Sequence, residues 1–237
     1  MPLSEAQAKV AASSARFRVF ISGRRVGKTT LCIRELIRYA SKPNSTVWYV
    51  SPSYRMSKEI VWSKLRGILT DINWVAKANE SDLSLTLKNG STIALKGADR
   101  PETMRGVSLK FLVMDEYADM KPEVWEQILR PALADQKGDA LFIGTPMGRN
   151  HFYDLYNYAC VADDPTFVGY HFTSYDNPLL DPEEIEAAKK SMSAFSFRQE
   201  FMASFEAQGS ELFKEDYIKF SEEEPTSGQY YIAVDLA

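Results

Sequence analysis

The sequence predicts an α/β fold in which a mainly parallel central sheet is flanked by helices. Three observations support this prediction. Short apolar runs rich in β-branched and aromatic residues alternate with segments of helical periodicity along most of the chain. A glycine-bearing loop joins one such run to the helical segment after it, and a later apolar run ends in two adjacent carboxylates. Strands separated by helices pair in parallel, because each crossover returns the chain to the same end of the sheet.

The first half of the chain contains alternating strand and helix signals, followed by a hairpin. We expect an amphipathic segment over residues 3–14, strands over 17–21 and 46–51, and helices over 28–40 and 56–69. The pair Asn89-Gly90 separates two alternating runs, 83–87 and 91–95, and is typical of a type I′ turn. This inserted β-hairpin places three leucines of its first arm on one face.

The second half continues the alternation and then becomes helical. We expect strands over 110–114, 140–144 and 167–172, and helices over 124–129, 152–159, 182–192 and 195–205. Pro131 is expected to end the helix that begins at Val124, since proline lacks the N–H that continues a helix.

Composition limits the class of protein. With 237 residues, 45% of them hydrophobic, the chain can bury the core of one large domain. No run approaches the roughly 20 apolar residues of a membrane-spanning helix. Cys32 and Cys160 are typical of reduced thiols, and His151 and His171 show no zinc-site spacing. The net charge of −4 argues against binding nucleic acid over the whole surface, so any DNA contacts must come from a local patch or from a region outside this sequence.

A phosphate-binding loop is predicted between the first strand and the helix after it. The loop reads Ser-Gly-Arg-Arg-Val-Gly-Lys-Thr from Ser22 to Thr29, with Ser22 where the usual pattern has glycine. Lys28 can neutralise the β- and γ-phosphates, and the Thr29 hydroxyl can bind Mg²⁺. The alternative is a strand-to-helix turn with a chance Gly-Lys-Thr. The residues expected to contact the nucleotide are Ser22, Gly23, Arg24, Arg25, Val26, Gly27, Lys28, Thr29 and Thr30.

The second chemical motif is the pair of carboxylates at the end of an apolar run. Residues 111–114 deliver Asp115 and Glu116 to the carboxyl end of a predicted strand. In P-loop ATPases the first acid holds Mg²⁺, usually through water, and the second orients and deprotonates the attacking water. We therefore expect a P-loop NTPase of the ASCE/RecA-like type that hydrolyses ATP with Mg²⁺, with Asp115 on the metal and Glu116 in catalysis.

The motifs together resemble those of the large terminase subunits of tailed double-stranded DNA phages. The two arginines inside the phosphate loop resemble that family's arginine-bearing variant of it. Residues 103–109, which lead directly into the acidic strand, resemble its Leu-Arg-Gly approach, with Met104 in place of leucine. Gly144-Thr145-Pro146 stands at the position of its coupling motif, and residues 174–178 and 197–201 resemble further landmarks.

The resemblance implies roles for individual residues. Arg24 would sense the γ-phosphate within its own subunit, and Arg105 would reach the nucleotide of a neighbouring subunit. Gln7 resembles the glutamine that recognises adenine, and Thr145 would relay hydrolysis to movement. Three of these roles have a structural alternative: an ion pair with a local acid such as Glu102 for Arg105, a polar position on an amphipathic helix for Gln7, and a Gly-Thr-Pro turn for Thr145.

The resemblance also implies the domain organisation. Residues 1–208 would form the ATPase domain, with a helical subdomain over about 180–208, and 209–228 a linker. Residues 229–237 would be the first strand of a truncated nuclease domain, with Asp235 as its first acid. No nuclease activity is expected from Asp235 alone, because a two-metal site needs several carboxylates.

The implied context is a DNA-packaging motor in the host cytoplasm, transiently on the procapsid portal. The expected partners are double-stranded DNA, the portal protein and the small terminase subunit, with a homo-oligomeric ring on assembly, a monomer in isolation and no membrane association. Other functions remain open from the residues: a helicase-like ATPase, a small-molecule kinase, or a nucleotide-switched assembly module, which would not need a general base such as Glu116.

Overall fold

The structure is a computed structural model and describes residues 3–206. Within this range no helix is long and apolar enough to cross a membrane. The elements, in chain order, are α1 (Glu5–Ala12), β1 (Phe17–Ser22), α2 (Lys28–Ala40), β2 (Thr46–Ser51), α3 (Tyr54–Ser57), η1 (Lys58–Trp62), α4 (Ser63–Asp71), β3 (Val75–Asn79), β4 (Ser84–Leu87), β5 (Thr92–Gly97), η2 (Pro101–Met104), β6 (Phe111–Asp115), η3 (Tyr117–Asp119), η4 (Val124–Leu129), α5 (Arg130–Ala132), β7 (Asp139–Gly144), α6 (His151–Val161), β8 (Phe167–Phe172), η5 (Ser174–Asp176), α7 (Pro182–Ser191) and α8 (Ala194–Glu200).

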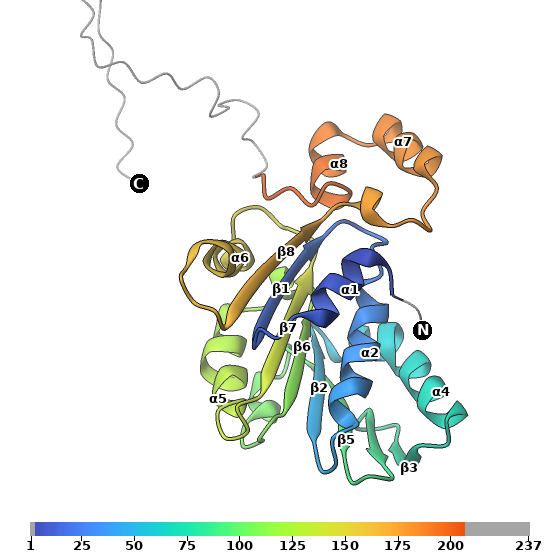
Figure 1. Cartoon of the computed structure of the whole chain (residues 1–237), viewed down its shortest axis with the longest axis vertical. Helices are drawn as coiled ribbons and strands as arrows, with labels where there is room; N and C mark the ends of the chain where they lie inside the picture. Colours follow the sequence, from blue (N-terminus) through green and yellow to red (C-terminus); the bar gives the residue numbers. More distant parts are fainter. Residues whose placement is uncertain (1–2, 207–237) are drawn as a thin grey trace, which may run out of the picture. The chain divides into compact units, whose positions relative to one another are not determined.

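In the described part of the chain, eight strands form one sheet in the order β3-β4-β5-β2-β6-β7-β1-β8 (Figure 1). The strands from β5 to β8 in this order are parallel, while β3 and β4 are antiparallel. The predicted mainly parallel sheet with an inserted hairpin is therefore confirmed. Strands β6, β7 and β1 lie side by side, so their carboxyl ends meet at one edge of the sheet.

Helices cover both faces of the sheet (Figure 1): α1, α2 and α4 pack on one face, and η4, α5 and α6 on the other. The side chains of β6 alternate between the two. Phe111 and Val113 belong to the core under α2, whereas Leu112 and Met114 belong to the opposite core. Tyr39 of α2 stacks on Phe111 with ring centroids 4.0 Å apart. A strand covered on both faces needs such a continuous apolar run.

The hairpin turn differs from the predicted type I′ turn. Gly90 takes a left-handed conformation with φ of +82°, but Asn89 does not take a positive φ. The Gly90 N–H donates to the Leu87 carbonyl at 3.0 Å, and the Leu87 N–H to the Ser91 carbonyl at 2.8 Å. This pattern is a three-residue loop with a glycine bulge. The Asn89 amide donates instead to the Ala40 carbonyl at 2.8 Å, and this tertiary contact favours the longer loop.

Strand β3 was not predicted from the sequence. It pairs with β4 at the outer edge of the sheet, and its middle residues, including Lys77, are exposed. Ala, Lys and Asn have low strand propensity, and an edge strand with one partner needs little apolar surface. The sequence pattern therefore carried no strand signal here.

Three predicted helices have different details. The helix predicted over 56–69 is one helical stretch from α3 to α4, interrupted by the π-helical turn η1. Pro131 does not end its helix but lies inside α5, where the wider π-helical turn η4 precedes it. The helix α8 ends at Glu200, earlier than predicted, and Ala203 beyond it takes a left-handed φ of +55°.

A buried ion pair joins β1 to α2. Arg18 and Glu35 are both fully buried, and an Arg18 Nη1 hydrogen donates to Glu35 Oε2 at 2.6 Å. The more exposed Arg38 donates to both Glu35 oxygens. Arg18 Nη1 also donates to the Val10 carbonyl at 3.2 Å, whereas its Nε and Nη2 have no hydrogen-bond partner among residues 3–206. Glu35 is therefore the carboxylate that compensates the buried Arg18 cation.

We expect Glu35→Leu to lower the free energy of unfolding by about 3–5 kcal/mol, because it leaves the Arg18 charge buried without its carboxylate. Urea denaturation measures the change. The control Arg38→Ala should cost at most about 1 kcal/mol, since the Arg38 side chain is half exposed and Glu35 keeps its Arg18 partner. The double variant Arg18→Met, Glu35→Leu should recover most of the loss. Equal instability of the single and double variants would contradict the assignment.

Candidate functional site

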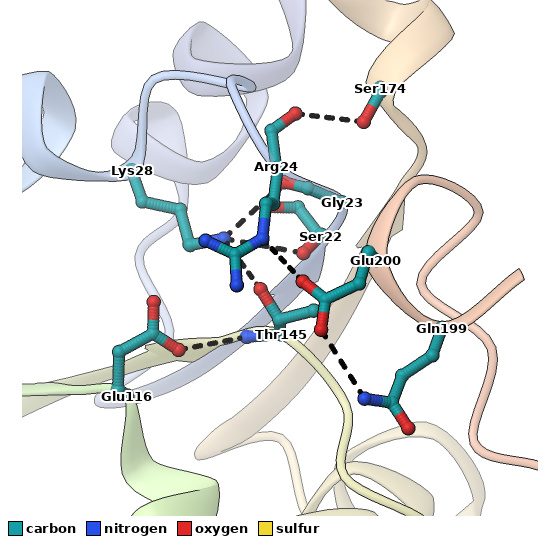
Figure 2. A network of polar contacts seen from close by, with 9 residues as sticks. All are labelled: Ser22, Gly23, Arg24, Lys28, Glu116, Thr145, Ser174, Gln199 and Glu200. Atoms are coloured by element: carbon teal, nitrogen blue, oxygen red, sulfur yellow. Dashed lines mark hydrogen bonds and ion pairs between the residues drawn. The ribbon is translucent and has the colours of Figure 1, made fainter. Parts of the chain in front are cut away.

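The loop between β1 and α2 wraps around the side chain of Lys28 (Figure 2). Lys28 Nζ donates to the carbonyls of Ser22 and Gly23, both at 3.3 Å, and to Thr145 Oγ1 at 3.2 Å. Gly27 precedes the first residue of α2 with φ of +89°, a conformation that glycine adopts without strain. The loop therefore ends at the N-terminus of a 13-residue helix, the end that attracts anions.

Serine is accommodated at the first position of the loop. Ser22 is the last residue of β1, is fully buried, and pairs with Phe172 of β8. Because Ser22 continues a strand, it does not need the conformational freedom of glycine. The departure from the usual pattern thus leaves the loop intact.

The remaining loop residues differ in exposure. Val26 is buried and anchors the loop in the core under α2. Arg24 and Arg25 are exposed, and Arg25 takes a left-handed φ of +65°. The partly exposed residues at the start of α2 are Gly27, Lys28, Thr29 and Thr30.

Asp115 and Glu116 lie at the carboxyl end of β6, at the same edge as the loop. Asp115 is only 4% exposed. It accepts hydrogen bonds from the Tyr49 hydroxyl and, at 3.0 Å, from the Glu116 N–H. Burial, and then the charge of Glu116, raise the pKa of Asp115 to about 6 against the opposing effects of Tyr49 and Lys28. Burial also lowers the pKa of Lys28, and the two carboxylates oppose that change.

Thr145 connects Lys28 to Glu116 (Figure 2). It follows β7, and its N–H donates to Glu116 Oε2 at 3.2 Å while its hydroxyl accepts from Lys28. A Cβ on the preceding Gly144 would lie 3.4 Å from the Cα and from Oε2 of Glu116 and 3.0 Å from a ring carbon of Phe152. The small residue lets β7 approach Glu116, which itself has a left-handed φ of +51°.

A segment distant in sequence supports the phosphate loop. The Gly23 N–H donates to the Phe172 carbonyl at 3.0 Å, and the Arg24 N–H to the Glu200 carbonyl at 2.7 Å. The Ser174 hydroxyl donates to the Arg24 carbonyl at 2.8 Å, and the Arg24 guanidinium pairs with the Glu200 carboxylate (Figure 2).

These supports were missed as site residues. Asn177 similarly donates from its side chain to the Arg25 carbonyl at 2.6 Å. The landmark segments 174–178 and 197–201 contain all three residues, and Asn177-Pro178 is also a turn signature, but neither signal says which loop the side chains meet. Tyr49 was also missed, because its ring lies in an ordinary apolar strand and only its hydroxyl marks it.

Gln7 is brought to the phosphate loop from α1. Its side chain is buried and donates to the carbonyls of Val26 at 3.2 Å and Gly27 at 3.0 Å. Its carbonyl oxygen accepts from the Ser4 N–H at 3.0 Å as part of a capping box. Gln7 therefore contacts the backbone of the loop.

Arg105 is not brought into this network. It lies in the exposed loop after η2, and within residues 3–206 it forms no ion pair with Glu102 or with another acid. The local ion pair considered as the alternative for Arg105 is therefore absent from the described part of the chain. Arg105 borders a surface hollow of about 220 Å³ that Gln127 and Pro131 also line.

The site fits a magnesium ion that comes with a polyphosphate. Among the described residues, no three His, Cys, Asp or Glu side chains gather as a metal site. Mg²⁺ in nucleotide sites typically uses one or two protein ligands, with water and phosphate oxygens completing its shell. The buried Asp115 carboxylate and the Thr29 hydroxyl suit that ligand set. The predicted linker over 209–228 and the strand over 229–237 with Asp235 lie outside the described residues.

Comparisons with known proteins agree on one family. Residues 19–220 match the family described as terminase large subunit, T4likevirus-type, N-terminal. The terminase large subunit of Escherichia phage T5 is 33% identical over 201 residues, which cover 84% of this chain and 46% of that protein. The terminase large subunit of Thermus virus P23-45 is 27% identical, with 85% of this chain and 48% of that protein covered. The chain thus spans about half the length of these relatives.

A solved structure has the same fold. The large terminase ATPase domain of Thermus phage P74-26 superposes with a TM-score of 0.77 at 24% identity, covering 86% of this chain and 94% of that one. The predicted P-loop fold class is confirmed by this likeness together with the strand order.

We expect Gly23→Ala to destabilise the protein by about 1–3 kcal/mol, because the added methyl group has no room. Its Cβ would lie 2.4 Å from the Phe201 carbonyl oxygen and 2.9 Å from the Ser174 nitrogen, both backbone atoms. Thermal denaturation measures the effect. The matched control is Gly67→Ala in α4, where an added Cβ would have no atom of the described residues within 4 Å apart from its neighbours and its own helix, so the change should stabilise by up to about 1 kcal/mol. Equal melting temperatures for the two variants would argue against the packing of the loop.

Proposed function

The chain belongs to the T4likevirus-type terminase large subunits, matched by the model of their N-terminal part, and from that membership we propose that it hydrolyses ATP to drive double-stranded DNA into a procapsid. The observation that carries the proposal is the convergence of Lys28, Glu116 and Thr145 where β1, β6 and β7 end. One cation and one base at the same edge of the sheet, both in contact with Thr145 at the end of the strand between them, suit phosphoryl transfer to water.

Binding of the polyphosphate rests on the loop and Lys28. The loop N–H groups, the N-terminus of α2 and the lysine cation all favour negative charge at the same place. The carbonyls of Ser22 and Gly23 and the Thr145 hydroxyl hold Lys28 Nζ at the mouth of the loop. In this proposal Lys28 neutralises the β- and γ-phosphates, as the residues from Ser22 to Thr30 enclose them.

Thr29 and Asp115 would hold Mg²⁺ through their oxygens. Bound there, Mg²⁺ neutralises charge on the phosphates during transfer. The Tyr49 hydroxyl and the Glu116 N–H fix the orientation of Asp115, because they occupy both of its oxygens.

Glu116 is the proposed general base. Its Oε2 accepts the Thr145 N–H at 3.2 Å, so the carboxylate is oriented while Oε1 is left to accept a proton from water. The strained left-handed conformation at Glu116 is of the kind found at functional sites. A pure nucleotide switch has no need for such a base, and this argues against the assembly-module alternative.

Two arginines are proposed to stabilise charge on the γ-phosphate. Arg24 is exposed on the loop beside Glu200, and an arginine can exchange one oxyanion partner for another. We infer that Arg24 senses the γ-phosphate of its own subunit. Arg105, exposed and without an acid partner in residues 3–206, is proposed to reach the nucleotide of a neighbouring subunit.

Thr145 is the proposed coupling residue. It touches both the lysine that binds the phosphates and the glutamate that activates water. A change in charge at the γ-phosphate would alter both contacts together, and β7 would carry the displacement into the sheet. The Gly-Thr-Pro turn that ends β7 is compatible with this role, since the turn presents the hydroxyl.

The wider context is proposed from family membership. The partners would be double-stranded DNA, the portal protein and the small terminase subunit, with subunits assembled as a ring in the host cytoplasm. With a net charge of −4, the DNA contacts would come from a local basic patch or from a region outside this sequence. Residues 1–208 would form the ATPase domain, including the helical subdomain that begins near 180.

We expect Glu116→Gln to bind ATP with near-normal affinity but to lose hydrolysis by a factor on the order of 10² to 10⁴, because the amide cannot accept a proton. Nucleotide titration and phosphate release measure the two steps. Lys28→Ala is the matched comparison and should lose both, since it removes the phosphate-binding cation. Loss of binding in Glu116→Gln equal to that in Lys28→Ala would assign Glu116 a structural role.

We expect Arg105→Ala and Lys28→Ala each to be inactive, and their mixture in one assembly to regain part of the ATPase rate. An arginine supplied from a neighbour is worth on the order of 10³ to 10⁵ in rate. Arg105→Ala keeps an intact pocket, and Lys28→Ala keeps an intact arginine, so mixed neighbours complete one site. DNA-stimulated phosphate release at varied ratios measures the recovery. Absence of recovery in confirmed mixed assemblies would place Arg105 outside the neighbour's site.

A further inference from the structure

The backbone directly after Glu116 is held by the side chain of Asn150. Asn150 is the N-cap of α6, and its Oδ1 accepts from the Phe152 N–H at 3.0 Å. Its Nδ2 donates to the Ala118 carbonyl of η3 at 3.2 Å. These two contacts fix which end of the amide is the donor, since the reversed amide would place oxygen against oxygen. One side chain therefore joins the start of α6 to the turn that follows the proposed general base.

The Ala118 carbonyl depends on this contact. The turn η3 ends at Asp119, and the chain is extended at Met120. Pro122, at the position that would donate in a continuing α-helix, has no N–H. No backbone N–H of residues 3–206 donates to the Ala118 carbonyl. Since Ala118 is buried and a buried carbonyl without a donor is costly, the Asn150 amide supplies what the backbone lacks.

His151 adds a second contact from the same helix. Its Nε2 lies 2.9 Å from the Tyr117 carbonyl oxygen, and the two rings meet edge to face with centroids 4.8 Å apart. The Tyr117 carbonyl also accepts from the Met120 N–H at 3.1 Å, so the turn itself already directs this carbonyl. The carbonyl whose direction depends on α6 is therefore that of Ala118.

Glu116 needs support because its backbone is strained. It has φ of +51° and ψ of +51°, a left-handed conformation that is unfavourable for residues other than glycine. Its carbonyl accepts from the Asp119 N–H at 3.0 Å, so η3 closes directly on it. A return of Glu116 to an ordinary φ would redirect η3 and break the contact between Ala118 and Asn150. This contact therefore opposes relaxation of the strained residue.

The loop from Thr145 to Asn150 acts on Glu116 from both of its ends. The Thr145 N–H orients the carboxylate through Oε2, and Asn150 holds the main chain that carries it. We propose that Asn150 is a positioning residue for Glu116, whose donor to Ala118 keeps the carboxylate directed toward the water that attacks ATP. The inference rests on the proposed ATP hydrolysis and adds a residue to that site.

The test compares Asn150→Asp with Asn150→Ser. Both residues cap a helix about as well as asparagine, so α6 keeps its start. Neither replaces the donor to Ala118, because a carboxylate only accepts and the serine side chain ends one atom earlier. Only Asn150→Asp adds a charge, so the pair separates the lost donor from electrostatics. Each full-length variant is assayed for ATP affinity and for DNA-stimulated hydrolysis at saturating ATP, well below its melting temperature.

Both variants should hydrolyse saturating ATP about three- to tenfold more slowly, the loss expected when one hydrogen bond no longer holds the base. ATP affinity should stay within about twofold, because Lys28 and the phosphate loop are untouched. In a Glu116→Gln background the same substitutions should not lower the residual rate further, since the base through which Asn150 acts is gone. Asn150→Ser alone carries the test if Asn150→Asp does not fold.

Unchanged hydrolysis in both variants would overturn the proposal. An equal fall in affinity and rate would also overturn it, because Asn150 would then support the pocket as a whole. So would a loss confined to Asn150→Asp, which assigns the effect to charge, or a further loss of the same size in the Glu116→Gln background. Failure of the unaltered chain to hydrolyse ATP would instead reject the proposed function.

Discussion

The mostly buried ammonium group of Lys28 is the constraint on which the site depends. Burial disfavours its charge and lowers its pKa, while Glu116 and Asp115 support the charged form. Its hydrogen-bond acceptors come from the ends of two strands, with Ser22 on β1 and Thr145 after β7. The cation can be compensated only where β6, β7 and β1 are adjacent. The charged form of Lys28 therefore depends on this strand order.

The local chemistry could be predicted from the sequence because each motif is contiguous. The phosphate loop needs glycine before Lys28 and a helix after it, and the bounds of α2 agree with the predicted 28–40. Asp115 follows four buried apolar residues, so its place at the end of a strand was predictable from the same run. The order of the strands was not encoded in any local pattern, although their alternation with helices indicated parallel pairing.

What the sequence did not predict depends on tertiary contacts. The prediction of a type I′ turn was wrong because the Asn89 side chain donates to the Ala40 carbonyl at the end of α2. These two residues are 49 positions apart in the sequence. Strand β3 has no apolar alternation. It forms because its backbone hydrogen-bonds to the edge strand β4. The supports of the loop, Ser174 and Glu200, lie in segments that resemble family landmarks, but the resemblance assigned them no contact with the loop. Their function comes from the residue they meet, which no spacing rule identifies.

The phosphate loop is held from both ends of the described chain, by Gln7 on one side and by Ser174, Asn177 and Glu200 on the other. This arrangement has a consequence for synthesis on the ribosome. The parallel core from β1 to β7 is complete in sequence before residue 150, but the loop lacks its later supports until about 50 further residues have emerged. A nascent chain would therefore complete the strands from β1 to β7 before the phosphate loop could make its contacts with Ser174, Asn177 and Glu200.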